Sequence, residues 1–173
     1  MRLAYAVLLV ATGAAAEPTP PPDTAPKTTL GIAAYRGATA GVQFTTGVRV
    51  ARTAYIDTQL GLGLFVPDAR DADVWSAQIG ASKVLWTEHS AVGARASLGY
   101  QRSEVTYFEA LFDDEPYTDY DNMIYGEGAL FLRGRLGPNL AIEALVALRV
   151  GAHTAGDGSA GTGYASLGLH ITM

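Results

Sequence analysis

Residues 164–173 read "YASLGLHITM" and alternate apolar side chains with small or polar ones up to the last residue. The apolar positions are Ala165, Leu167, Leu169, Ile171 and Met173. A two-residue period indicates an extended strand with one apolar face and one polar face. Because chain ends usually fray unless other elements hold them, an ordered terminal strand must pair with a neighbour. The sequence therefore predicts that the end of the chain closes a sheet.

The same alternation recurs along the chain from Thr28 onward, and no helical period of useful length interrupts it. The strands implied by this pattern run roughly 8–13 residues, which brackets the ~9–11 that a tilted strand needs to cross a bilayer. The apolar positions delimit eight segments: 30–34, 42–50, 56–64, 75–85, 92–100, 124–132, 140–150 and 165–173. An even number of short alternating strands is typical of an antiparallel barrel.

Composition decides which face of this barrel points inward. A soluble, lipocalin-like barrel buries its apolar face and covers the other with charge, whereas a membrane barrel does the reverse. Charged residues make up only 17% of this chain, and there are 20 glycines. The polar positions of the strands are mostly Gly, Ser, Thr and Gln, which suit a narrow filled interior. We therefore expect the apolar face to meet lipid.

The N-terminus has the pattern of an export signal. Residues 1–16 contain one basic residue, a short apolar stretch and three alanines before Glu17, so we expect cleavage after Ala16. Residues 17–27 are rich in proline and predict an extended, unpaired periplasmic tail, and residues 28–173 form the barrel. The absence of cysteine excludes disulfides and thiolate metal sites, and the net charge of −5 argues against a nucleic-acid partner.

The links between strands alternate in length, as they do in membrane barrels with short periplasmic turns and longer external loops. Short links are expected at 51–54, 87–90 and 137–139, and longer ones at 66–73, 103–122 and 151–161. The remaining external link, 36–40, is short. This order places both termini in the periplasm.

Together these features resemble the small eight-stranded outer-membrane barrels of the outer-membrane protein A and X type. The resemblance covers about residues 28–173. In that family the terminal strand is a recognition signal for the barrel assembly machinery and usually ends in an aromatic residue, whereas this chain ends in Met173. The resemblance implies that Leu169, Ile171 and Met173 carry the assembly signal. It also implies that the partners are outer-membrane lipid or lipopolysaccharide and that the chain is a monomer.

An enzymatic reading fails on the spacing of the reactive residues. His153, Thr154, Asp157 and Ser159 fall in one external link, but the lipid A deacylase family carries His-x-Ser and this chain has Ala155 at that position. Leu167 stands where that family needs a carboxylate. His89 and His170 have no second imidazole nearby in the sequence, so we expect neither zinc nor another cofactor.

The link 103–122 contains seven carboxylates and no Lys or Arg. Its spacing matches no calcium-binding loop. A solvated acidic loop, a partner-binding loop and a cation site remain as interpretations. The carboxylates singled out as an external acidic loop are Asp113, Asp114, Glu115, Asp119 and Asp121.

The lumen-facing positions carry charges that we expect to form a network. Residues opposed across an antiparallel hairpin have numbers with a constant sum. A turn at 137–139 gives a sum of about 276, which sets Glu127 against Arg149 and Arg133 against Glu143. A turn centred on Thr53 sets Arg49 against Asp57, and Arg95 completes the set. The alternative is a solvated interior in which these charges pair loosely.

Two aromatic residues, Trp75 and Tyr100, lie on the apolar face and predict part of an interfacial girdle. Lys83 shares that face near a periplasmic turn, from where it can reach water. The sequence thus predicts an all-β, eight-stranded antiparallel transmembrane up-and-down barrel in the outer membrane of a Gram-negative bacterium. Its expected role is non-enzymatic, structural or in surface interaction through external loops. A lipid A-modifying enzyme and a small-solute channel are the alternatives.

Overall fold

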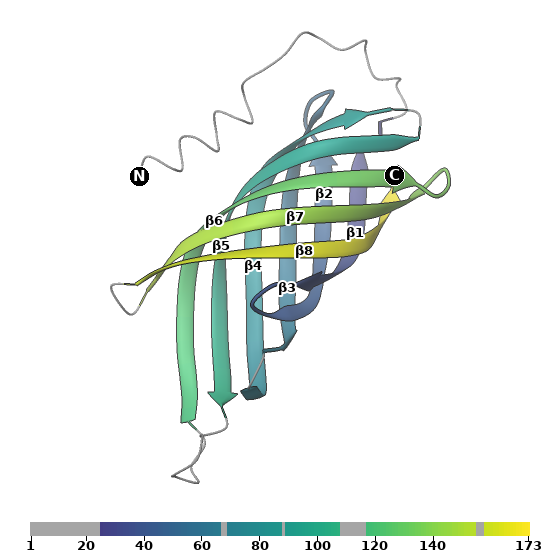
Figure 1. The fold of residues 1–173 in the computed structure, drawn as a ribbon. Coiled ribbons are helices and arrows are strands. Elements are labelled where there is room, and N and C mark those ends of the chain that lie inside the picture. Colours follow the sequence, from purple (N-terminus) through teal and green to yellow (C-terminus); the bar gives the residue numbers. More distant parts are fainter. Residues whose placement is uncertain (1–24, 67–68, 88, 108–116, 155–157) are drawn as a thin grey trace.

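The computed structural model describes residues 25–66, 69–87, 89–107, 117–154 and 158–173. The predicted signal and most of the predicted tail lie outside them. Eight strands form one closed antiparallel barrel, in which each strand pairs with its neighbours in sequence and the last pairs with the first (Figure 1). The strands are β1 (Thr28–Arg36), β2 (Ala40–Arg49), β3 (Ala54–Phe65), β4 (Ala69–Trp86), β5 (Ser90–Tyr107), β6 (Tyr117–Arg135), β7 (Leu140–His153) and β8 (Ser159–Thr172). Among the described residues, no helix is long and apolar enough to cross a membrane.

The terminal strand closes the barrel, as its alternation predicted. β8 pairs with β1 from Thr29 opposite Thr172 to Arg36 opposite Ala165. The carbonyl oxygen of Met173 accepts hydrogen bonds from the backbone N–H groups of Lys27 and Thr28. The ladder therefore continues through the last residue, and neither β1 nor β8 has a free edge along this seam.

The barrel has a turn end and a loop end. The turn end carries residues 50–53, 87–89 and 136–139 together with both ends of the described chain, and the loop end carries the other four connections. At the turn end, the last residues of the predicted tail form hydrogen bonds with the barrel, whereas the sequence predicted an unpaired tail. Ala25 is buried, its carbonyl oxygen accepts a hydrogen bond from Arg49 Nη1, and the carbonyl oxygen of Pro26 accepts one from the Tyr55 hydroxyl.

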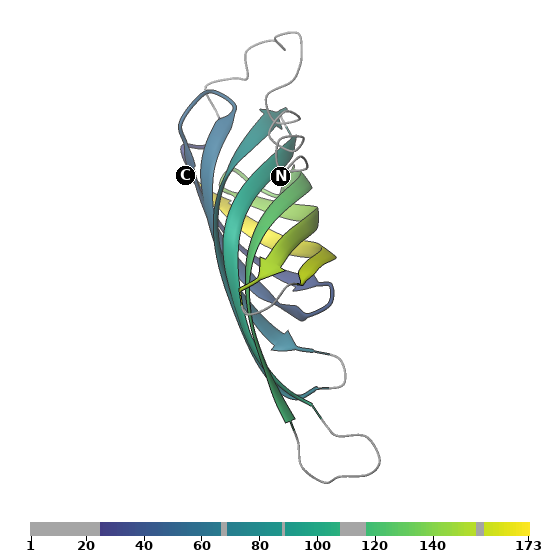
Figure 2. The same cartoon turned by 90° about the vertical axis from the view of Figure 1, so that its left-hand side faces the viewer.

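The strands on one side of the barrel are longer than the apolar pattern predicted. β4, β5 and β6 have 18, 18 and 19 residues, so the connections shrink to 66–68, 108–116 and 154–158. At ~3.3 Å per residue and a tilt of about 40°, such a strand spans roughly 45 Å along the barrel axis, more than the ~30 Å of a bilayer core. The β5–β6 hairpin accordingly projects beyond the other strands in Figures 1 and 2. The sequence missed this extension because a strand outside lipid has no need of an apolar face.

The outer face of the barrel is apolar, and the inner face combines buried polar and charged side chains with a group of apolar ones. Along β7, Ile142, Val146 and Leu148 are exposed, whereas Glu143 and Leu145 between them are buried. The same alternation exposes large apolar side chains on all eight strands. A continuous apolar belt of this kind is far larger than the patches that soluble monomers expose.

The expected aromatic and basic residues of the outer face are near its two ends. Trp75 and Tyr100 lie toward the loop end with ring centroids 5.6 Å apart, and the Tyr100 hydroxyl donates to Asn122 Oδ1. Lys83 is exposed near the turn end, opposite Ala54. Leu169, Ile171 and Met173 of the expected assembly signal are exposed on the same outer face.

Candidate functional site

Four charged side chains and one histidine point into the lumen and form a cluster near the turn end, which we call the turn-side cluster (Asp57, Arg95, Arg133, Glu143 and His170). Glu143 is its centre: Arg133 Nε lies 2.6 Å from Oε2, and His170 Nε2 lies 3.2 Å from Oε1. Arg95 lies between two carboxylates, 3.9 Å from Glu143 and 3.9 Å from Asp57. All five side chains are almost completely buried. The close pair of Arg133 and Glu143 offsets part of the cost of removing these ions from water, whereas the Arg95 nitrogens have no hydrogen-bond partner among the described residues.

A layer of apolar side chains lies beside this cluster. The guanidinium groups of Arg133 and Arg95 lie 4.7 and 5.5 Å from the centre of the Phe131 ring in this layer. Such cation–aromatic contacts stabilise a charge that is removed from water. The buried members of the layer are Ala25, Tyr55, Val84, Trp86, Ala91, Ala129, Phe131, Leu145 and Ala147.

Two of the three charge pairs predicted from the hairpin register are present in the structure. Glu127 is opposite Arg149, and Arg133 is opposite Glu143, in the β6–β7 ladder. Arg149 Nη2 donates to Glu127 Oε2 at 3.0 Å.

The third expected pair, Arg49 with Asp57, is wrong. The β2–β3 register sets Arg49 opposite Tyr55 and Asp57 opposite Gly47. The cause is the turn, which is centred one residue earlier than expected, with the N–H of Val50 donating to the carbonyl of Ala54. Asp57 therefore lies opposite Gly47, which has no side chain to exclude the carboxylate. The nearest opposite charge is the guanidinium of Arg95, 3.9 Å away.

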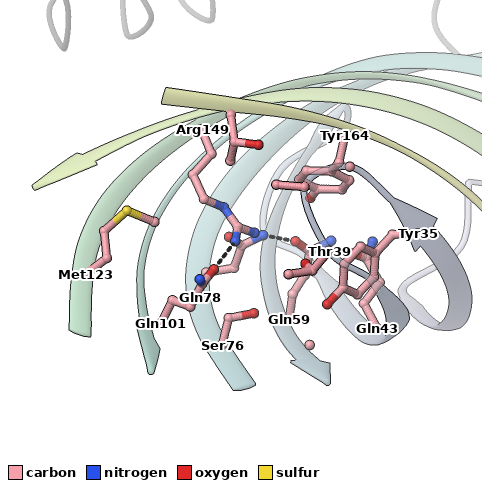
Figure 3. Close-up of a pocket in the computed structure, with 14 residues that line it drawn as sticks. Tyr35, Thr39, Gln43, Gln59, Ser76, Gln78, Gln101, Met123, Arg149 and Tyr164 are labelled. Atoms are coloured by element: carbon pink, nitrogen blue, oxygen red, sulfur yellow. Dashed lines mark hydrogen bonds between the residues drawn. The ribbon is translucent and has the colours of Figure 1, made fainter. Parts of the chain in front are cut away.

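A second group of polar side chains lies in the lumen toward the loop end. Gln78 donates to Gln59 Oε1 and also to Glu127 Oε1, the latter at 3.0 Å. Arg149 Nη1 donates to Gln101 Oε1 at 2.8 Å, and the guanidinium lies 3.9 Å from the ring centre of Tyr125. Several of these side chains border a small cavity that also contacts Tyr35 and Tyr164 (Figure 3).

Inward-facing glycines make room for the rings of the lumen. Gly93 is opposite Phe131, and Gly99 is opposite Tyr125. A Cβ atom at either glycine would come within 2.5 Å of the ring that faces it. At these two positions a ring on β6 therefore packs over a glycine on β5, which suits the narrow interior of an eight-stranded barrel.

At the loop end, Asp121 and His153 are in contact, although the sequence did not predict that they would pair. Asp121 Oδ1 lies 2.6 Å from His153 Nδ1, and both side chains are partly exposed. Asp119 and Asp121 belong to β6, opposite Val105 and Ser103, and not to a loop. The other acidic-loop residues, Asp113, Asp114 and Glu115, lie outside the described residues, as does Asp157.

Two residues considered for the enzymatic alternative, His153 and Ser159, lie near the loop end, on β7 and β8. Ser159 is opposite Ala152 in the β7–β8 ladder, and His153 has Asp121 as its contact. Within the described ranges, no three His, Asp or Glu side chains are grouped as a metal site would need.

The sequence did not predict the lumen contacts of three glutamines and of His170. Gln59, Gln78 and Gln101 hold inward positions on three successive strands, and His170 contacts Glu143. Their inward parity was visible in the sequence. The contacts themselves were not, because they depend on the stagger between strands that are distant in sequence.

Comparisons with known proteins identify the class of fold. No protein-family model matches the sequence, and none of the curated proteins matches it. Among solved structures, the N-terminal β-barrel domain of Pseudomonas aeruginosa OprF is similar with a TM-score of 0.61 and 13% identity, over 84% of this chain and 96% of that one. Neisserial surface protein A (NspA) gives 0.59 and 14%, over 84% and 96%.

A third similar structure is a major outer membrane protein of Thermus thermophilus, with a TM-score of 0.60 and 11% identity over 85% of this chain and 98% of that one. At such identities the similarity is one of fold. The chain has the closed eight-stranded antiparallel fold of small outer-membrane barrels, which confirms the fold class predicted from the sequence.

Proposed function

We propose that this chain is a non-enzymatic protein of the bacterial outer membrane that presents an interaction surface outside the cell. The observation that carries the proposal is the inverted polarity of the barrel. Its outer face is a belt of Leu, Ile, Val and Phe, and its inner face holds buried ion pairs. Contact of this apolar outer face with lipid hydrocarbon is favourable, whereas its contact with water would be costly.

The export features extend this proposal to topology. The predicted signal, residues 1–16, would take the chain out of the cytoplasm, and the short turns suit the periplasmic side. The loop end would then face outward. By resemblance, Leu169, Ile171 and Met173 would address the chain to the barrel assembly machinery, and lipopolysaccharide would surround the outer leaflet.

The projecting part of β4, β5 and β6 is the proposed interaction surface. Its described side chains are mainly acidic: Asp71, Asp73, Glu104, Asp119 and Asp121, with Arg102 and the partly exposed His153 nearby. The connection 108–116 adds Glu109, Asp113, Asp114 and Glu115. An acidic surface of this kind favours a basic partner over an anionic one.

The lumen does not offer a continuous path in this proposal. The apolar layer and the turn-side cluster would fill it near the turn end, and Ala25 and Pro26 lie against that end. A channel for solutes is therefore not part of the proposed role.

Fractionation of expressing cells tests the location. The full chain should sediment with the outer membrane and should migrate differently on gels before and after boiling, because a closed barrel resists detergent. Recovery in the soluble periplasmic fraction after gentle lysis would refute the membrane proposal. An epitope tag inserted within 108–116 should be reached by antibody on intact cells, whereas one at 137–138 should not; the reverse pattern would refute the topology.

A further inference from the structure

A cavity of about 80 Å³ lies inside the lumen between the turn-side cluster and the loop end. Figure 3 shows four glutamines and Arg149 around it, with Tyr35 and Tyr164 on one side. The β1–β2 turn borders the cavity at Thr39, and the cavity is partly open. At roughly 10–15 Å³ for each water, this space accommodates about five to eight water molecules or a small organic molecule of that size.

Three buried polar atoms at this cavity have unused hydrogen-bonding capacity, one each on Gln43, Gln78 and Tyr164. Gln43 is 5% exposed and Gln78 is 8% exposed. Among the described residues, Gln43 Nε2 has no acceptor and Gln78 Oε1 has no donor. Buried polar atoms usually have partners, and those at this cavity are therefore available to a molecule from outside the chain.

The charge and the walls of the cavity define the chemistry of that molecule. The charge of Arg149 is already neutralised by Glu127 at 3.0 Å, so the site offers no free cation to an anionic ligand. Tyr35 and Tyr164 pack edge to face with ring centroids 5.8 Å apart and supply an apolar wall. A hydroxyl group both donates and accepts, and two adjacent hydroxyls can therefore serve the donor of Gln43 and the acceptor of Gln78 together.

We propose that this cavity is a binding site for a small neutral polyol: glycerol itself, or the diol of a sugar unit that enters from the loop end. The site is separate from the projecting acidic surface. It depends on the barrel fold, but not on the proposed surface role.

Nuclear magnetic resonance of the refolded full chain tests the site directly. The protein is labelled with ¹⁵N at glutamine and studied in a phosphocholine detergent, because glycoside detergents would compete for the site. Glycerol and methyl glucoside are titrated separately. We expect the side-chain amide signals of Gln43 and Gln78 to shift along a saturable curve with at least one of the two probes. If only glycerol does so, the ligand is a free polyol; if methyl glucoside also saturates, a sugar unit fits.

Two variants separate binding from a general solvent effect. Gln43→Met keeps the volume of the side chain but removes its donor, so the binding followed at Gln78 should weaken by about tenfold. Ser97→Ala is the control, because the Ser97 hydroxyl is also buried and without a partner among the described residues but does not border the cavity. Its binding should be unchanged.

Linear shifts that never saturate with either probe would mean that water alone occupies the cavity, and the proposal would be wrong. Equal binding by the Gln43→Met variant would also overturn it. The gel shift on boiling checks that each variant is folded, so a failed fold is not counted as lost binding.

Discussion

Individual charged side chains in the lumen of this barrel are positioned by hydrogen bonds to side chains on other strands. Glu127 accepts hydrogen bonds from Arg149 on β7 and from Gln78 on β4. Arg149 in turn contacts Tyr125 and Gln101. Because each charge is largely removed from water, its stability depends on the partner being present.

Removal of one member of this pair should be costly. Glu127→Gln and Arg149→Gln are each expected to lower the free energy of unfolding by about 3–5 kcal/mol, because each leaves a buried charge without its counterion. The double variant should cost less than the sum of the two, with a coupling of about 0.5–3 kcal/mol. Equilibrium unfolding in denaturant measures all three, and strictly additive effects would show that the pair contributes nothing.

The glycines opposite rings give a second expectation at this scale. Gly93→Ala should destabilise the barrel by about 1–3 kcal/mol, because the new Cβ would overlap the Phe131 ring. Gly126→Ala is the matched control: it lies on the same sheet, faces outward, and has its nearest atom at 3.9 Å. Alanine there should be neutral or slightly stabilising, since glycine weakens a strand. The same unfolding measurement compares them, and equal costs would contradict this packing.

At the scale of strands, the extension of β5 and β6 beyond the lipid-sized segment is held by its own pairing. Tyr107 is opposite Tyr117, and the hydroxyls of Thr106 and Thr118 are 2.9 Å apart. This ladder ends where the connection 108–116 begins. The connection is therefore expected to be dispensable for the barrel.

Replacement of 108–116 by a short Gly-Ser link should leave the free energy of unfolding within about 1 kcal/mol of the natural chain, because the entropy of loop closure changes slowly with length. Binding of any basic partner should weaken, since Asp113, Asp114 and Glu115 are lost. Denaturant unfolding and the gel shift on boiling check the first point. A barrel that no longer folds would show that the connection is part of the structure.

The strands could be predicted from the sequence to different degrees. All eight were visible where lipid imposes a two-residue apolar period, as in Leu140 to Val150. The extension of β4 to β6 was not visible, because residues such as Asp119 and Thr118 pair through their backbones and need no apolar face. The pairing register of a hairpin could be predicted only where the centre of its turn was known. The assumed centre was correct for the hairpin that pairs Glu127 with Arg149. It was one residue too late for the hairpin in which Arg49 was expected to face Asp57.

For the whole molecule, the proposed filling of the turn end predicts a protein that does not conduct. In planar bilayers we expect no stable single-channel steps, because in this proposal the apolar layer around Phe131 and the turn-side cluster would block the lumen of a narrow barrel. The variant Phe131→Ala is a useful comparison, since it removes a large ring of that layer. Stable steps from the natural chain would contradict the filled lumen.

The central claim, that the outer face of this barrel lies in hydrocarbon, is open to one direct measurement. The chain has no cysteine, so single cysteines at Ala144, Val146 and Leu148 on β7 can each carry one fluorescent label in refolded vesicles. We expect nitroxide lipids to quench all three labels and aqueous iodide to leave them bright, with the opposite result for a label at Asn139 in the turn. Quenching of Ala144, Val146 and Leu148 by iodide but not by nitroxide lipid would show a water-facing surface and contradict the account.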